Sequence, residues 1–222
     1  MDNIIQIRDL TFAYAAGDEP VLSDINIDIS SGEFVIIMGS SGSGKTTLLK
    51  MLKRNMIPAG RYSGRVYIYG KEADKLTDRE NAAGIGYVSQ DPDNQIVTDK
   101  VWHELAFGLE NLGMDNVTIR KKVAEMSEYF GITGWYDKEV SKLSGGQKQI
   151  LNLASVMVMQ PGILLLDEPT ANLDPLAAIR FLDVVKRINQ ELGVTVVMVE
   201  HNLEHIYADA DRIIAIDKGR VA

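Results

Sequence analysis

The first candidate site is a run of glycines and serines that ends in a lysine and a threonine. It reads Gly39-Ser40-Ser41-Gly42-Ser43-Gly44-Lys45-Thr46. Glycines at this spacing let successive backbone N–H groups turn toward phosphate oxygens, and a following helix adds its positive end. In such a loop Lys45 reaches the β- and γ-phosphates and the Thr46 hydroxyl binds Mg²⁺. The run, with the adjoining Thr47, therefore predicts a site for ATP and Mg²⁺.

Two adjacent carboxylates form the second candidate site. The apolar run from Ile163 to Leu166 ends in Asp167 and Glu168. Enzymes that transfer phosphoryl groups hold their metal and their attacking water with such side chains. We expect Asp167 to bind Mg²⁺ through water and Glu168 to polarise the attacking water.

A second anion-binding site, called the second cradle below, is predicted at the start of a later helix; the glycine-rich loop at 39–46 is the first. The second cradle reads Leu143-Ser144-Gly145-Gly146-Gln147. A serine hydroxyl that caps a helix, followed by glycine amides without side chains, can surround an anion. One chain that binds one nucleotide has no obvious need for two such cradles.

The elements that must position these residues predict an α/β fold with a mixed sheet. Strands are indicated at 4–7, 21–29, 34–37, 65–69 and 85–88, with a helix from 45 to about 54. From about 99 to 160 the apolar residues recur at helical spacing, as at Val101, Leu105 and Leu109. The chain then alternates through a strand at 163–166, a helix at 175–192, a strand at 194–199, a short helix and a hairpin around 217–219.

Composition excludes several classes of protein. The chain has 222 residues, of which 45% are hydrophobic and 24% charged, as in an ordinary globular protein. It contains no cysteine, so disulfides, thiolate metal sites and cysteine nucleophiles are excluded. The net charge of −8 disfavours nucleic-acid binding. The longest apolar runs fall far short of the ~20 residues that span a bilayer and no secretory signal is visible, so we expect a cytoplasmic location.

Together, these segments resemble the ABC ATPase family. The family signature reads Leu-Ser-Gly-Gly-Gln, as at Leu143 to Gln147, and binds the γ-phosphate of an ATP held on a partner subunit. The resemblance covers essentially the whole chain and implies one ABC ATPase domain over 1–222. Its P-loop NTPase (RecA-like) core, with an N-terminal antiparallel β subdomain, would occupy about 1–90 and 161–222. An inserted helical subdomain would occupy about 91–160, and two such domains would pair head to tail.

The resemblance also assigns roles to residues outside the loops. Tyr14 matches the aromatic that stacks on adenine, although a packed strand-end tyrosine would look the same. Gln90 matches a glutamine that contacts Mg²⁺ and the lytic water and links to the membrane subunit. Asp174 lies in the loop that crosses the dimer interface, and it also suits a helix cap. His201 matches the histidine that holds the γ-phosphate.

Three further positions need comment. His201 and His205, four residues apart, would also suit a pair of metal ligands, but no third ligand lies nearby in the sequence. His103 is interpreted as a solvated helix residue. Ile150 stands where many relatives have an arginine, a departure that touches no phosphate contact.

A narrower resemblance concerns the class of transporter. The segments 90–95 and 105–113 resemble the ATPases of energy-coupling-factor importers, which take up vitamins and transition-metal ions. This implies a membrane-peripheral subunit that pairs with an identical or related ATPase on a transmembrane coupling subunit. Ile96 or Val97 would then fit into a groove of a coupling helix, with core packing as the alternative for either residue. A soluble ABC ATPase without transport function, or another importer class, is the alternative.

Overall fold

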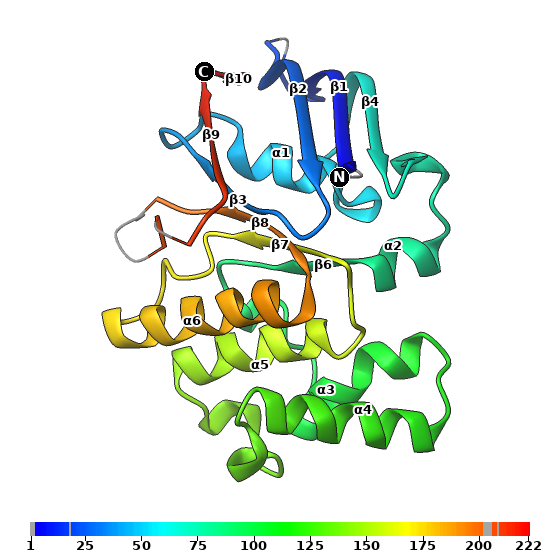
Figure 1. The fold of residues 1–222 in the computed structure, drawn as a ribbon, viewed down its shortest axis with the longest axis vertical. Coiled ribbons are helices and arrows are strands. Elements are labelled where there is room, and N and C mark those ends of the chain that lie inside the picture. Colours follow the sequence, from blue (N-terminus) through cyan, green and yellow to red (C-terminus); the bar gives the residue numbers. More distant parts are fainter. Residues whose placement is uncertain (1–2, 18, 202–205, 208) are drawn as a thin grey trace.

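The computed structural model describes residues 3–17, 19–201, 206–207 and 209–222, which form two sheets separated by a helix (Figure 1). The first sheet is antiparallel, with the strand order β2-β1-β4-β5. Its strands are β1 (Asn3–Tyr14), β2 (Leu22–Ser30), β4 (Gly60–Ile68) and β5 (Lys71–Glu72). This sheet agrees with the expected N-terminal antiparallel subdomain.

The second sheet has six strands in the order β10-β9-β3-β8-β7-β6. It comprises β3 (Phe34–Met38), β6 (Ile85–Val88), β7 (Ile163–Asp167), β8 (Thr195–Val199), β9 (Arg212–Asp217) and β10 (Arg220–Val221). The pairs from β9 to β6 are parallel, and only β10 runs antiparallel to its neighbour. The predicted α/β fold with a mixed sheet is confirmed.

Helices cover both faces of this sheet. They are α1 (Lys45–Met51), α2 (Asp78–Gly84), α3 (Val101–Asn111), α4 (Asn116–Tyr129), α5 (Gly145–Met157) and α6 (Pro175–Leu192). Short 3₁₀ turns lie at Arg54–Met56, Ala73–Lys75, Pro92–Asn94, Thr133–Trp135 and Val140–Lys142. Helix α1 lies between the two sheets, α5 and α6 lie on the opposite side of the six-stranded sheet, and α3 and α4 form a layer beyond them (Figure 1).

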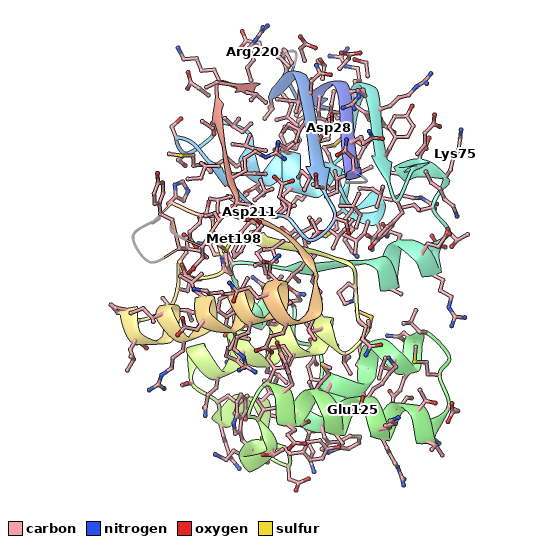
Figure 2. All side chains as sticks on the ribbon, in the orientation of Figure 1. Asp28, Lys75, Glu125, Met198, Asp211 and Arg220 are labelled. Atoms are coloured by element: carbon pink, nitrogen blue, oxygen red, sulfur yellow. The ribbon has the colours of Figure 1, made fainter. Side chains whose placement is uncertain are left out.

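The residues of β3 show how the sequence sets these layers. Phe34 and Ile36 belong to the apolar cluster that packs under α5 and α6, whereas Val35 and Ile37 belong to the cluster around α1. Successive side chains of a strand point to opposite faces, so a solid apolar run is buried on both. Met198 of β8, labelled in Figure 2, is fully buried in the first of these clusters.

Three predicted boundaries are wrong for identifiable reasons. The strand predicted at 4–7 is the start of a twelve-residue strand. Its alternation is interrupted at Asp9, which has a φ of 51°, where the pairing with both neighbours shifts. The strand predicted at 65–69 begins earlier, at Gly60. The prediction missed its first half because those residues are exposed and show no alternation of apolar and polar side chains. The first helix ends at Met51 rather than near 54, because Lys53 leaves the helix and its ammonium donates to the carbonyls of Asn81 in α2 and Ile85 at the start of β6.

We expect Phe181→Ala to lower the free energy of unfolding by about 3–5 kcal/mol. Phe181 lies on α6 with no exposed surface, in the cluster with Phe34 and Leu166. Its removal deletes buried apolar surface and leaves a cavity. Denaturant unfolding followed by circular dichroism measures the change. Leu192→Ala, at the 46% exposed end of the same helix, should change stability by less than about 1 kcal/mol, and equal effects of the two changes would contradict this view of the core.

Candidate functional site

The phosphate-binding loop lies between β3 and α1, where the sequence predicts it. Gly39 has a φ of 152°, and a Cβ there would lie 2.1 Å from the carbonyl oxygen of Ile216. Gly44, with a φ of 104°, would meet the Val21 carbonyl at 2.9 Å. Only glycine therefore suits either position. Lys45 is 4% exposed, and its Nζ donates to the carbonyls of Gly39 and Ser40 at 2.9 Å each.

The loop and the second strand end meet at one carboxylate. The Thr46 hydroxyl donates to Oδ1 of Asp167 at 2.8 Å, and the Tyr87 hydroxyl donates to Oδ2 at 2.7 Å. Asp167 is only 8% exposed. Burial, together with the neighbouring Asp167 charge, raises the pKa of Tyr87 well above its usual range, so Tyr87 stays protonated and acts as the donor.

Glu168 and His201 are brought together as a pair. Nε2 of His201 lies 2.9 Å from Oε1 of Glu168, and both side chains are partly exposed. Glu168 has a φ of 47°, which is unfavourable for a residue with a side chain, and its N–H donates to the Val199 carbonyl at 2.9 Å. Such backbone strain persists where the surrounding structure enforces it, and it clusters at functional sites.

Residues of the phosphate loop share one hollow of about 360 Å³ with Tyr14 and Glu168. It is lined by Tyr14, Val21, Ser41, Gly42, Gly44, Lys45, Thr46, Thr47 and Glu168. The Tyr14 ring is 39% exposed, packs edge-on against Phe12 at 5.0 Å, and has its hydroxyl 2.8 Å from Oγ1 of Thr47. A ring that is held at its edge while it remains accessible suits a stacking platform better than a packed core tyrosine does.

The second cradle lies in a different hollow of about 500 Å³. This hollow is lined in part by Ser144, Gly145, Gly146 and Gln147 of the α5 start, by Ile150, and by Asp174. Ser144 and Gln147 form a capping box, and Asp174 caps α6 by accepting from the N–H groups of Leu176 and Ala177. Within one chain, the two cradles therefore do not face the same space.

Gln90 and His103 are not among the residues that line the hollow at the phosphate loop. Gln90 is exposed, and its only hydrogen bond in the described part of the chain is that of its carbonyl with Asn172 at 3.3 Å. His103 stacks on Trp102 and lies 3.8 Å from Glu110, as a solvated helix residue would. His205 lies outside the described residues. Among the described residues, no group of three or more histidine or acidic side chains gathers as a metal site.

Three polar residues that no sequence motif marks also hold this region together. Tyr87 is described above. Gln149 of α5 is fully buried and donates to the carbonyls of Ser89 and Pro169 at 3.1 and 2.9 Å. Gln95 donates to the Tyr87 carbonyl at 2.7 Å and accepts from the Ser89 N–H at 2.9 Å. The role of Tyr87 becomes visible only from its position on β6 beside the strand that ends in the carboxylates.

A separate groove of about 540 Å³ lies between α2 and the helices α3 and α5. Its lining includes Lys53, Gln95, Val97, Glu104 and Phe107. Burial lowers the pKa of the Lys53 ammonium to about 8. Ile96 packs against the core, whereas Val97 is 63% exposed. Of the two residues that the sequence offered for a contact with a coupling helix, only Val97 is therefore well exposed on the surface.

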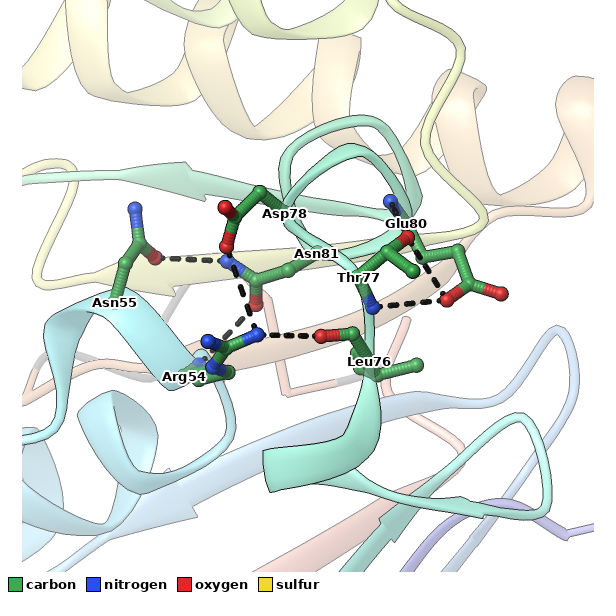
Figure 3. A network of polar contacts seen from close by, with 7 residues as sticks. All are labelled: Arg54, Asn55, Leu76, Thr77, Asp78, Glu80 and Asn81. Atoms are coloured by element: carbon green, nitrogen blue, oxygen red, sulfur yellow. Dashed lines mark hydrogen bonds and ion pairs between the residues drawn. The ribbon is translucent and has the colours of Figure 1, made fainter.

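One wall of this groove is fixed by the polar network in Figure 3. Asn81 of α2 accepts from the Arg54 N–H at 3.2 Å and donates to Asn55 at 3.0 Å. The Arg54 guanidinium donates to the Leu76 carbonyl at 2.5 Å and lies 3.5 Å from Asp78. The segment that follows α1 is therefore tied to the start of α2.

A P-loop ATPase is defined by the features now described: the mixed sheet, the loop that surrounds Lys45, and the strand end at Asp167 and Glu168. The helical layer adds the second cradle. A family described as ABC transporter matches residues 22–171. The chain belongs to this family and is an ATPase domain, as its loops predict.

Two relatives illustrate the similarity. An ABC transporter ATP-binding protein of Bacillus cereus is 47% identical over 216 residues, covering 97% of this chain and 39% of that protein. The chain therefore spans about two fifths of that relative. An energy-coupling factor transporter ATP-binding protein, EcfA1 of Caldanaerobacter subterraneus, is 40% identical over 98% of this chain and 79% of its own length.

Solved structures agree with the fold. The structure of cbiO1 from Clostridium perfringens, part of the ABC transporter complex cbiONQ, matches with a TM-score of 0.90 at 33% identity. It covers 100% of this chain and 88% of that one. The ATP-binding cassette MJ0796, solved as a dimer bound to ADP and Pi, matches with a TM-score of 0.83 at 28% identity, covering 98% and 96%.

Proposed function

We propose that residues 1–222 form one ABC ATPase domain that binds and hydrolyses ATP to drive an importer of the energy-coupling-factor class, with a vitamin or a transition-metal ion as solute. The observation that carries the ATPase proposal is the meeting of Lys45, the Thr46–Asp167 pair and the Glu168–His201 pair around one phosphate loop. The importer class rests on the names of similar proteins, EcfA1 and cbiO1.

The donors at the loop suit Mg²⁺. Mg²⁺ prefers oxygen ligands and usually binds through one or two protein groups, with phosphates and water in the remaining positions. Thr46 offers a hydroxyl oxygen and Asp167 a buried carboxylate, already 2.8 Å apart. Gln90 is the third proposed ligand, and its exposed loop would have to bring the side chain toward Thr46 and Asp167 when the nucleotide binds. When bound, Mg²⁺ neutralises and orients the phosphate oxygens.

The remaining residues act on the nucleotide and the water. The Tyr14 ring stacks on adenine, the loop amides from Gly39 to Thr47 surround the phosphates, and Lys45 contacts the β- and γ-phosphates. Glu168 accepts a proton from the attacking water as its oxygen bonds to the γ-phosphorus and the bond to the bridging oxygen of ADP breaks. His201, which lies 2.9 Å from Glu168, holds the γ-phosphate beside this carboxylate.

We infer that the second cradle serves a partner chain. Ser144, Gly145, Gly146 and Gln147 line a hollow separate from the phosphate loop, so they contact the γ-phosphate of ATP bound to another ATPase. Asp174 lies at the same surface. A head-to-tail dimer, either of this chain or with a related subunit, would close two nucleotides between opposed loops and cradles, as befits the similarity to a cassette solved as a dimer.

The groove beside α2 suits a transmembrane coupling subunit. No helix in the described parts of the chain is long and apolar enough to cross a bilayer. In this proposal, the solute is carried by a separate membrane subunit. Exposed Val97 and Phe107 offer apolar contacts to a helix of that subunit, and Lys53 and Glu104 lie in the same groove. The domain would then lie at the cytoplasmic face of the membrane.

We expect Val97→Asp to weaken association with the coupling subunit at least about tenfold, because it places a charge against an apolar helix surface. ATP hydrolysis by the isolated domain should remain within about twofold of wild type. Val117→Asp is the matched control, because Val117 is also exposed but lies at the start of α4, outside the groove. Co-expression with an energy-coupling-factor coupling subunit and purification in detergent measures the association.

The function itself is tested by Mg²⁺-dependent release of phosphate from ATP and by solute uptake in vesicles that contain the assembled complex. ATP hydrolysis without any association with a coupling subunit would favour a soluble ABC ATPase or another importer class. Absence of ATP binding would reject the proposal.

A further inference from the structure

Tyr87 contacts the site from a strand to which no role has yet been given. It lies on β6, is 8% exposed, and its hydroxyl donates to Oδ2 of Asp167 at 2.7 Å. The other carboxylate oxygen accepts from Thr46 at 2.8 Å. Both oxygens of Asp167 are therefore held by hydroxyl donors from different elements, one on β6 and one at the phosphate loop.

The strand register explains why this tyrosine reaches the carboxylate. In the parallel pair of β6 and β7, Tyr87 lies opposite Leu165. Residues two apart on a strand share a face, so Leu165 and Asp167 point to the same side of the sheet as Tyr87. The tyrosine ring lies in the apolar cluster with Ile85 and Ile163, and its length carries the hydroxyl toward the strand end, where Asp167 lies.

The contact with Tyr87 restricts the orientation of the Asp167 carboxylate. A carboxylate with one held oxygen can rotate about its last bond, whereas one held on both oxygens has a fixed plane. Asp167 is buried, so water does not readily replace a lost donor. The backbone of Tyr87 is itself fixed, because its carbonyl accepts from Gln95 at 2.7 Å.

We propose that Tyr87 is a positioning residue of the metal site, which fixes the plane of the Asp167 carboxylate so that Asp167 and Thr46 present their oxygens together to nucleotide-bound Mg²⁺. This inference rests on the proposed ATP and Mg²⁺ site. Tyr87 touches neither the nucleotide nor the reacting atoms and acts only through Asp167.

The test compares ATP affinity with and without the metal. Binding is measured by titration calorimetry in the Glu168→Gln background, so that hydrolysis does not interfere, once with Mg²⁺ and once with EDTA. We expect Tyr87→Phe to leave the EDTA affinity within about twofold and to weaken Mg²⁺-dependent binding about tenfold, the size expected for a lost hydrogen bond to a charged group. Mn²⁺ binding to the ATP-loaded protein, followed by electron paramagnetic resonance, should weaken to the same extent.

Tyr69→Phe is the matched control. The Tyr69 hydroxyl also makes a 2.7 Å hydrogen bond, to the Gly84 carbonyl, but it lies away from the phosphate loop. This variant should bind ATP as the parent does under both conditions. A double variant, Tyr87→Phe with Asp167→Asn, should be no weaker in Mg²⁺-dependent binding than Asp167→Asn alone, because Tyr87 acts through that carboxylate.

Each other outcome is decisive. Equal losses with Mg²⁺ and with EDTA would overturn the inference, since the hydroxyl would then support only the folded loop. Unchanged Mg²⁺-dependent binding in Tyr87→Phe would overturn it as well. If the parent protein itself shows no gain in ATP affinity from Mg²⁺, the failure lies with the proposed metal site and not with Tyr87 alone.

Discussion

The Glu168→Gln variant should bind ATP about as well as wild type and lose hydrolysis by about 10²- to 10⁴-fold, the usual contribution of a positioned general base. The amide keeps the size of the side chain but cannot accept a proton from water. The contacts of Lys45 and of the loop amides with the phosphates do not depend on it. Phosphate release and calorimetric ATP binding measure the two effects separately.

The same variant should accumulate as an ATP-bound dimer, because the step that reopens the sandwich is blocked. Size-exclusion chromatography with light scattering, with and without ATP and Mg²⁺, detects the change in mass. Glu125→Gln is the control: Glu125 lies on α4, in the helical layer far from α1, and should behave as wild type (Figure 2). If Glu168→Gln binds ATP and stays monomeric, closure requires another chain. If it hydrolyses ATP at the wild-type rate, Glu168 is not the base.

The parts of the site that could be predicted are those fixed by local backbone chemistry. Helix α6 begins and ends where the sequence places it, because Asp174 and Pro175 define its start and Gly193, with a φ of 66°, its end. The phosphate loop was equally predictable, since its glycines are required by backbone approach and positive φ. The solid run of β3 predicted a strand buried on both faces.

The parts that could not be predicted depend on contacts between distant segments. The bulge at Asp9 and the early end of α1 arise from pairing and burial that a single segment does not encode. The contact of Tyr87 with Asp167 joins residues eighty positions apart, and it follows only once the order of β6 and β7 is known. The buried amides of Gln95 and Gln149 likewise look like ordinary polar residues in the sequence.

The Lys45→Met variant should weaken ATP binding by at least about a hundredfold, since it removes charge-assisted hydrogen bonds worth about 1.5–3 kcal/mol each. The Lys45 ammonium is held within the loop by the carbonyls of Gly39 and Ser40, so it is already placed where a nucleotide would bring its phosphates. Methionine preserves the apolar stem of the side chain, and the fold should therefore survive.

Lys50→Met, on the last turn of the same helix and outside the hollow, controls for the loss of one positive charge. Calorimetric titration with ATP in EDTA isolates this contact from the metal. Wild-type affinity in Lys45→Met would mean that the nucleotide does not bind at this loop, and the roles given to Thr46, Asp167 and Glu168 would fail with it.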